Sequence, residues 1–522
     1  MATLQGSATT RERTQGTRRT RGLEFAALAF LIPFVVRMIP ELIAWPYPLG
    51  FDTLGYYIPA MRWWINPFKG QSLPTDIPGT LRTAGLFHVV STGFNRYVIL
   101  DPFIAVKILG PMLTGLVSVL VYSYARRVLI WTPGKAMFSS LIATLYFVGL
   151  RISWELYRNM LGVVFLFAAL IALETFEGTR RYFLTGFLVL MTFMSHQITG
   201  AILLGVFLLR GIWLLARGHQ KEAGIHLCFS AMSAGLLLYQ LYLPQVGRIA
   251  LPAVLSRPRW NMDAAGYVLG FPVYCFIFLL PLALVGARLR RRAAIDFWTL
   301  SCVLLLAPPL VLGVNSIPLW FRWPLMLMYP LSFYAAEGFG KAMRFRSWRV
   351  PSGLTVKIAA LGLIALIGVT SAFYLAAYPE HPFPYFSQYN PYVRYVQSSM
   401  LQNSISIQDT PSLLSAIDAA SPLLGAGTVL VVHEAVYVWA VNRLGITTKI
   451  VPVKEPGYLS ANPPSISDSV ERVASLSYDS GYKVYTIWWS GGSSWYTMPE
   501  LPTSFKLVEN TGTFGVYLFN PA

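Results

Sequence analysis

Long apolar segments follow one another through about the first 380 residues of this chain, with short basic loops between them. A helix needs roughly twenty mostly apolar residues to cross the hydrocarbon core of a bilayer. Only 12% of the 522 residues are charged and 55% are hydrophobic, whereas about a quarter of a soluble protein is charged. We therefore predict an α-helical polytopic membrane protein with about eleven transmembrane helices. The expected spans are Leu23–Ala44, Pro102–Tyr124, Ala136–Leu150, Leu161–Leu173, Tyr182–Ser195, Thr199–Leu215, Gly224–Leu243, Gly266–Gly286, Phe297–Gly313, Pro318–Gly340 and Val356–Tyr378.

The positive charges of the chain concentrate in the loops that follow every second span. Because cytoplasmic loops carry the excess of Lys and Arg, this alternation predicts an integral plasma-membrane protein whose N-terminus is cytoplasmic. An odd number of spans then places the C-terminal part and the loop after the first span outside. This orientation accounts for the net charge of +18, so we expect no nucleic-acid partner. The basic loops are Arg126–Lys135, Glu177–Arg181, Arg217–Lys221, Arg288–Arg292 and Lys341–Arg349.

The chain divides into three parts. Residues 1–22 form a basic tail that we expect to be disordered and cytoplasmic, and the apolar run after it is typical of a retained span rather than a cleaved signal. Residues 23–379 form a transmembrane domain with a long first outer loop, 45–101. Residues 380–522 form an extracytoplasmic α/β domain, because strand-like and helix-like segments alternate there. The three cysteines lie in apolar segments, so we expect neither a disulfide framework nor a thiolate metal site.

The expected elements of the α/β domain can be placed individually. Helices are predicted at 412–420, 435–443 and 466–476, and strands at 428–433, 448–453, 483–489, 505–509 and 515–519. The first strand, within VLVVHEAV, lacks the glycines of a phosphate-binding loop, so no nucleotide site is predicted. An aromatic group near Gly491–Gly492 suits either a shelf for a sugar ring or the domain core. Core packing is favoured for its in-strand members; the group is Trp488, Trp489, Trp495 and Tyr496.

The first outer loop begins with one acidic residue, Asp52, in a Gly-Phe-Asp-Thr turn. The apolar residues after it recur at spacings of three and four, which predicts an amphipathic helix rich in Tyr and Trp, residues that settle at a membrane boundary. Such a helix would hold the Asp52 carboxylate just outside the hydrocarbon. The alternative is an ordinary loop with a solvated Asp. The other charged residues that stand out on the outer side are Asp76, Asp101, Glu155, Arg158, His196, Arg248, Arg257, Arg259, Asp263 and Arg322, and Arg37 and Glu41 lie one turn apart within the first span.

These features resemble the GT-C superfamily of integral-membrane glycosyltransferases, in particular the prokaryotic relatives of protein O-mannosyltransferases and of the aminoarabinose lipid A transferase. The resemblance covers about the first 380 residues. It rests on a first span that leads into a long outer loop with an early Asp flanked by Tyr residues, and on three loose motifs. These motifs are LDPFIAVKILGP before the second span, LRISWELYRNMLG between the third and fourth, and Arg-Trp-Pro at the start of a later span.

The resemblance implies transfer of a sugar, such as mannose, from a polyprenyl-phosphate donor to a protein, lipid or glycan acceptor, with inversion. Asp52 matches the general base for the acceptor hydroxyl, and Arg322 matches the residue that holds the donor phosphate. Arg158 and Arg259 are further candidates for the phosphate, because Arg grips two phosphate oxygens with its planar fork. Candidates for other substrate contacts are Tyr56, Tyr57, His196, Glu155 and Asp101.

One departure from the superfamily pattern concerns a metal ion. Many members pair two acids in the loop, whereas Thr53 and Leu54 follow Asp52 here. A hard divalent cation usually takes more than one carboxylate, so a requirement for Mg²⁺ or Mn²⁺ stays open.

Simpler roles also fit these residues. Arg158 and Glu155 are three apart and suit a structural ion pair. Arg322 suits a boundary anchor between Trp320 and Trp323, and His196 suits a helix cap. For the whole chain, a lipid or solute transporter is disfavoured because its late prolines have no early counterparts. A non-catalytic membrane subunit with an outer partner-binding domain is the other alternative.

Overall fold

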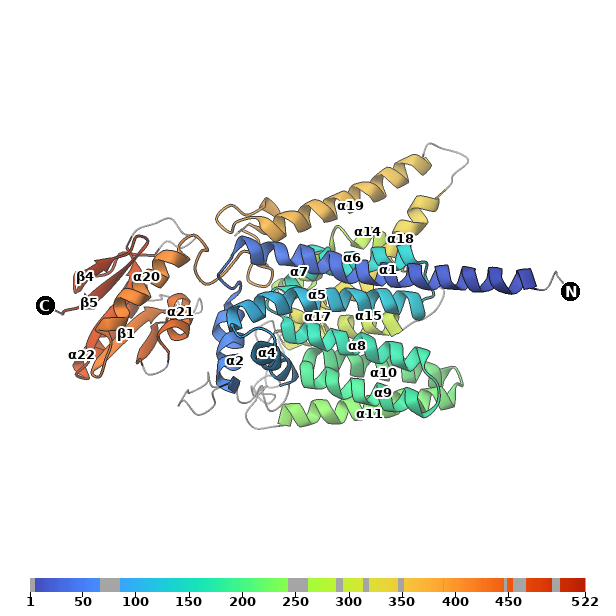
Figure 1. The fold of residues 1–522 in the computed structure, drawn as a ribbon, viewed down its shortest axis with the longest axis horizontal. Helices are drawn as coiled ribbons and strands as arrows, with labels where there is room; N and C mark the ends of the chain where they lie inside the picture. The colour runs from blue at the N-terminus through green and yellow to red at the C-terminus, as the bar shows by residue number, and fades with distance from the viewer. Residues whose placement is uncertain are drawn as a thin grey trace.

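The computed structural model describes residues 5–65, 85–242, 262–287, 294–312, 319–345, 352–387, 389–445, 448–453, 466–490 and 498–521. A bundle of helices makes up most of the molecule, and a small α/β domain lies at one end of it, with the N-terminus at the other end (Figure 1). The helices at the domain end include short ones that run across the bundle. This end is where Asp52 and Glu155 meet.

The bundle is built from long apolar helices and several shorter ones. The tail expected to be disordered is instead helical, because α1 extends back to Gln5; its residues include Arg, Glu, Gln and Ala, which are good helix formers. The first half contains α1 (Gln5–Ile43), η1 (Thr53–Tyr57), α2 (Ile58–Ile65), α4 (Leu86–Tyr97), α5 (Pro102–Arg127), α6 (Pro133–Leu145), α7 (Phe147–Ser153), α8 (Tyr157–Thr175), α9 (Gly178–Ser195), α10 (Gln197–Ala216) and α11 (Gln220–Tyr242). The second half contains α13 (Met262–Phe276), α14 (Leu280–Gly286), α15 (Ala294–Leu304), α16 (Ala307–Leu312), α17 (Arg322–Leu325), α18 (Met328–Arg344) and α19 (Ser352–Ala376).

The described residues contain six helices that are long and apolar enough to cross a membrane, or up to eight if each bent helix pair forms one span. One bent pair is α6 and α7, which meet at 62°, and the other is formed by α13 and α14 at 85°. The prediction of a mostly helical protein with several apolar helices long enough to span a membrane is therefore confirmed. The count of eleven spans stays a prediction.

Two glycines allow α14 and α18 to pack backbone to backbone. A Cβ at Gly286 would lie 1.8 Å from the carbonyl oxygen of Tyr334, and one at Gly338 would lie 1.8 Å from the carbonyl oxygen of Leu282. Small residues at such crossings are typical of helices packed within membranes. This contact fixes α18, whose N-terminal end follows the short helix α17 that carries Arg322.

The C-terminal domain is a five-stranded sheet with helices, as predicted. The strand order is β2-β1-β3-β5-β4; β1 pairs in parallel with β2 and β3, and β5 pairs antiparallel with β3 and β4. Trp488 and Trp489 are buried, which confirms core packing for both, while Trp495 and Tyr496 lie outside the described residues. The elements are η3 (Pro384–Phe386), α20 (Thr410–Ala420), η4 (Ser421–Leu423), β1 (Thr428–His433), α21 (Glu434–Leu444), β2 (Ile450–Val453), α22 (Ile466–Asp479), β3 (Lys483–Trp489), β4 (Phe505–Asn510) and β5 (Phe514–Phe519).

Candidate active site

Asp52 and Glu155 come together although 103 positions separate them in the chain. The backbone N–H of Asp52 donates to Oε1 of Glu155 over 2.9 Å. Gly50 makes this approach possible, since a Cβ there would lie 2.6 Å from both Cγ and Oε1 of Glu155, and its φ is +89°. Glu155 itself has a φ of +93°, a conformation that costs a non-glycine residue about 1–3 kcal/mol. Strain of this kind is kept where the surroundings enforce it, and it often marks a functional site.

The surroundings of the two carboxyl groups affect their pKa values differently. Glu155 lies in the turn between α7 and α8, where burial first and the charge of Asp52 second raise its pKa to about 8. Burial also raises the pKa of Asp52, but the positive charges of Arg322, Arg151 and Arg158 oppose that rise. The nearby cations therefore favour the charged form of Asp52, whereas burial and the charge of Asp52 favour the protonated form of Glu155. Two carboxyl groups with separated titrations are a common arrangement for acid–base chemistry.

Three arginines from three helices face Asp52. Arg151 comes from α7, Arg158 from α8 and Arg322 from α17. Each keeps one buried N–H without a hydrogen-bond partner among the described residues: Nη1 of Arg151, Nε of Arg158 and Nε of Arg322. A buried donor without an acceptor is costly, and three converging cationic donors suit an anion with several oxygens.

The remaining contacts of these arginines hold them in place. Arg151 donates from Nε to the carbonyl oxygen of Tyr395 over 2.8 Å, and its guanidinium lies 5.2 Å from the ring centroid of Trp154. Arg158 donates to the hydroxyl of Tyr56 over 3.4 Å, and that hydroxyl lies 3.2 Å from Nε2 of His88. The ion pair considered for Arg158 and Glu155 is not present, because the two side chains contact Tyr56 and Asp52 instead.

His196 combines the helix cap considered for it with a contact to the arginine group. Its Nδ1 accepts from the N–H of Ile198 over 3.1 Å, which caps α10. Burial and the charges of Arg158 and Arg322 lower its pKa well below the usual range, so the ring is neutral. A neutral ring with Nδ1 as acceptor carries its proton on Nε2. Nε2 lies 3.4 Å from Nη1 of Arg322, so two donors face each other and one anionic oxygen would satisfy both.

Seven of the nine predicted site residues therefore meet at one place. Tyr57 joins them through its hydroxyl, which donates to the carbonyl oxygen of Glu155 over 2.9 Å. Asp101 has a different position: its exposed side chain caps α5 by accepting from the N–H groups of Phe103 and Ile104. Arg259 lies outside the described residues, as do Asp76, Arg248 and Arg257.

Sequence reasoning missed Arg151, His88 and the role of Gly50. Arg151 belongs to the same LRISWELYRNMLG motif as Arg158, so a count of cations per motif would have found it. His88 lies on α4, 32 positions after its partner Tyr56, and nothing in the local sequence pairs the two. Gly50 could have been suspected from its place two residues before the candidate acid.

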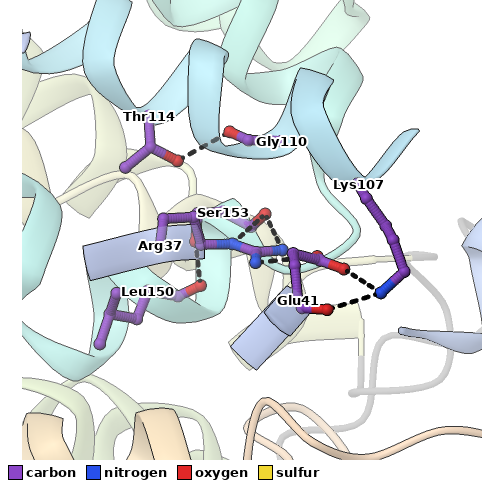
Figure 2. A network of polar contacts seen from close by, with 7 residues as sticks. All are labelled: Arg37, Glu41, Lys107, Gly110, Thr114, Leu150 and Ser153. Carbon is purple, nitrogen blue, oxygen red and sulfur yellow. Dashed lines mark hydrogen bonds and ion pairs between the residues drawn. The ribbon is translucent and has the colours of Figure 1, made fainter. Parts of the chain in front are cut away.

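A buried ionic network contacts Ser153 at the end of α7, close to the turn that carries Glu155 (Figure 2). Arg37 on α1 donates to Oε1 of Glu41 over 2.9 Å, and through Nε and Nη2 to the carbonyl oxygen of Ser153 over 3.4 Å each. Lys107 on α5 donates to the carbonyl oxygen of Glu41 over 2.8 Å. All three charged side chains are at most 2% exposed. The network links α1, α5 and the end of α7, two residues before Glu155.

The C-terminal domain reaches the same loop through α21. The side-chain amide of Asn442 donates to the carbonyl oxygen of Leu54 in η1 over 2.9 Å. Arg62 on α2 donates to the backbone carbonyl oxygen of Asn442 over 2.6 Å. The segment leading to the domain adds bonds from Asn403 to the carbonyl oxygen of Pro48 (2.6 Å) and from Gly50 to that of Gln402 (3.3 Å). The domain therefore forms part of the wall around the Asp52 loop.

The carboxyl pair was tested as a metal site. A hard cation is usually held by several oxygen ligands, and the described residues contain no group of three or more His, Cys, Asp or Glu side chains placed to hold a metal ion. One carboxyl oxygen of Glu155 already accepts a backbone hydrogen bond, and three guanidinium groups lie close to Asp52. These residues do not fit a divalent cation.

The chain shares its fold with a solved glycosyltransferase structure. The arabinofuranosyltransferase AftD from Mycobacteria superimposes with a TM-score of 0.51 over 96% of this chain and 40% of that chain, at 13% sequence identity. This likeness shows the fold alone, and the chain spans less than half of AftD.

Two further solved structures give lower scores. ArnT from Cupriavidus metallidurans aligns over 96% of this chain and 98% of that chain. The TM-score is 0.49 at 11% identity for the form bound to undecaprenyl phosphate, and 0.46 at 12% identity for the apo form. No protein-family model matches the chain, and no curated protein matches it by sequence.

Proposed function

We propose that the protein transfers a sugar from a polyprenyl-phosphate donor to an acceptor hydroxyl on the extracytoplasmic membrane face, with inversion at the anomeric carbon. The observation that carries this proposal is the Asp52 carboxyl group among three arginines that each keep one buried N–H without a partner, on a GT-C fold. Such a site would offer a base for a proton next to cationic donors for a phosphate. The strained backbone of Glu155 beside Asp52 favours this role over that of a subunit without catalytic activity.

The arginine group would bind the donor phosphate. Arg322, Arg158 and Arg151 offer planar forks of donors, and the Nε2–H of His196 adds a neutral one beside Arg322. These donors are held by the protein before the reaction begins. They therefore stabilise the charge that develops on the phosphate as the bond from the anomeric carbon to the phosphate oxygen breaks.

Asp52 would act as the general base. An acceptor hydroxyl is a poor nucleophile at neutral pH, and a positioned carboxylate that takes its proton typically contributes a factor of about 10²–10⁴. The acceptor oxygen forms its bond to the anomeric carbon on the face opposite the departing phosphate, its proton moves to Asp52, and the configuration inverts. Glu155 stays protonated and keeps the loop in place through the N–H of Asp52.

The experiment that tests this proposal is transfer of a radiolabelled sugar by the purified full-length protein. The assay contains native membrane lipids and a panel of polyprenyl-phosphate sugars that includes mannose and arabinose. We expect label transfer by the wild type and a loss of at least about 10²-fold in Asp52→Asn. Asp101→Asn is the matched control, because it removes an acid of the same outer loop that caps α5 away from the site.

Full activity of Asp52→Asn would exclude Asp52 as the base. Arg322→Gln separates donor binding from folding: we expect a higher apparent KM for the donor in protein that elutes and unfolds as the wild type does. An unchanged donor KM would contradict the phosphate role of Arg322.

A further inference from the structure

Two cavities lie end to end along α6, and α19 lines one of them. The first, of about 600 Å³, lies at the turn between α5 and α6 and at the end of α18; Trp131, Lys135, Phe339 and Arg344 line it. The second, of about 330 Å³, is lined by α1, α6, α7 and α19. Phe138 lines both. Figure 1 shows α19 close to the bundle near its Ala376 end and diverging from α1 toward its Ser352 end.

The first cavity carries positive charge and an indole. Nζ of Lys135 lies 3.7 Å from the ring centroid of Trp131, and Lys135 also pairs with Glu337. Arg344 is exposed, lines the cavity, and donates from Nε to the carbonyl oxygen of Gly340 over 3.0 Å. Because Glu337 balances Lys135, Arg344 and the nearby Arg126 give this end its excess of positive charge.

The second cavity is apolar. Its polar side chains are those of Tyr146 and Ser371, and both hydroxyls are already satisfied: Tyr146 donates to the carbonyl oxygen of Cys275 over 2.8 Å, and Ser371 to that of Ile367 over 2.6 Å. A Cβ at Gly368 would meet no heavy atom within 4 Å, so the α19 side of this cavity has room. This apolar lining suits a hydrocarbon chain, whereas a polar group that entered would lose its hydrogen bonds to water.

A cationic, aromatic end joined to an apolar channel matches an amphiphile with an anionic head. We propose that the two cavities form one site for a membrane phospholipid with an anionic headgroup, the phosphate at Arg344 and Lys135 and one acyl chain between α6 and α19. Basic pockets between transmembrane helices at the cytoplasmic surface bind such headgroups. The site lies at the Arg127 end of α5, whereas Asp52 and its arginines lie toward the Pro102 end, so it is distinct from the proposed donor site.

The proposal is tested by native mass spectrometry of the full-length protein, released from detergent with added phosphatidylglycerol or phosphatidylcholine of identical acyl chains. We expect the wild type to retain phosphatidylglycerol preferentially. Arg344→Gln should lower that preference about fivefold, the factor for loss of one charge interaction at an anionic surface. Arg217→Gln is the control: Arg217 lies in another basic loop and also contacts an indole, that of Trp213, with 5.4 Å to the ring centroid.

A second pair of variants tests the acyl chain. Gly368→Leu places a side chain in the apolar cavity and should lower retention of both lipids, whereas Gly362→Leu on the same helix, which also has open space at Cβ, should not. Equal retention of the two lipids by the wild type would overturn the proposal. So would equal behaviour of Gly368→Leu and Gly362→Leu, or displacement of the lipid by inorganic phosphate alone, which would indicate a site for a free anion. None of these measurements depends on glycosyl transfer.

Discussion

The two carboxyl groups of the site differ in how they meet their surroundings, and this difference explains how one can serve as a base. Asp52 is partly exposed and lies among three cations, whereas Glu155 is buried beside the negative charge of Asp52. Both differences favour a proton on Glu155 over one on Asp52. A protonated Glu155 leaves the arginines with a single acid to balance, so the group as a whole keeps the positive charge that a donor phosphate requires.

Replacement of Glu155 by Gln tests whether the pKa of Glu155 is raised in the folded protein. In the unfolded chain Glu155 has its ordinary pKa near 4.5, whereas in the folded protein the pKa is raised to about 8. Between these values the folded state binds a proton that the unfolded state releases, so the contribution of Glu155 to stability falls as the pH rises from 4.5 to 8 and is level above that. Glu155→Gln mimics the protonated group. We therefore expect the Tm of the variant to rise relative to the Tm of the wild type as the pH increases from 4.5 to 8. Parallel Tm curves for the two proteins would exclude the raised pKa.

Gly50 offers a test of the strained turn. Ala at this position requires a left-handed backbone and pushes its Cβ against Glu155, so Gly50→Ala should lower the free energy of unfolding by roughly 1–3 kcal/mol and move the Asp52 loop. The transfer rate should fall together with stability. Gly93→Ala in α4 is the control, since its Cβ would meet no heavy atom within 4 Å and Ala favours a helix. Wild-type stability and rate in Gly50→Ala would contradict the close approach.

At the scale of elements, the site depends on one π-helical turn held from two sides. η1 follows Asp52 directly. π-helical turns are rare in proteins, and those that occur are frequently found at functional sites. Tyr57 ties it to Glu155 in the bundle, and Asn442 of α21 ties the Leu54 carbonyl to the C-terminal domain. Through this bond the C-terminal domain is linked to the turn next to the proposed base.

Asn442→Ala tests this link. Loss of the bond to Leu54 frees η1, so we expect kcat to fall several-fold, while the KM for the donor, whose phosphate contacts lie in the bundle, changes little. Arg443→Ala is the matched control on the same helix: its side chain pairs with Asp418 at the exposed surface, 2.8 Å away. A larger loss in Arg443→Ala than in Asn442→Ala would show that the domain acts by general stability rather than through η1.

The elements of the α/β domain were predictable because their patterns are local. Each of its five strands and three α-helices lies within a few residues of its predicted place. The arrangement of the site was predictable only in part. Asp52, Arg158 and Arg322 could be named from motifs, but the approach of Glu155 to Gly50 and the orphaned N–H groups arise from tertiary packing. The break between α6 and α7 at Tyr146 was also missed, since an uninterrupted apolar run does not reveal a 62° bend.

At the scale of the whole molecule, the proposed reaction requires the Asp52 site and the C-terminal domain to lie on the same side of the membrane. The bonds from Asn442 to Leu54 and from Asn403 to Pro48 satisfy this requirement. The basic loops predict which side it is, because the positive-inside rule assigns the opposite end of the bundle to the cytoplasm. The phospholipid site proposed above then faces the inner leaflet, where anionic headgroups meet juxtamembrane cations.

This orientation can be tested by labelling single cysteines with a membrane-impermeant maleimide in intact cells. Cys228 is exposed and is first replaced by Ser, whereas the thiols of Cys275 and Cys302 are buried. Ser415→Cys on the exposed face of α20 should then be labelled from outside, and His219→Cys, in the basic loop between α10 and α11, only after the cells are opened. The reverse pattern would place the arginine group in the cytoplasm. There the donor would have to present its sugar from the inner leaflet, and the extracytoplasmic reaction would be excluded.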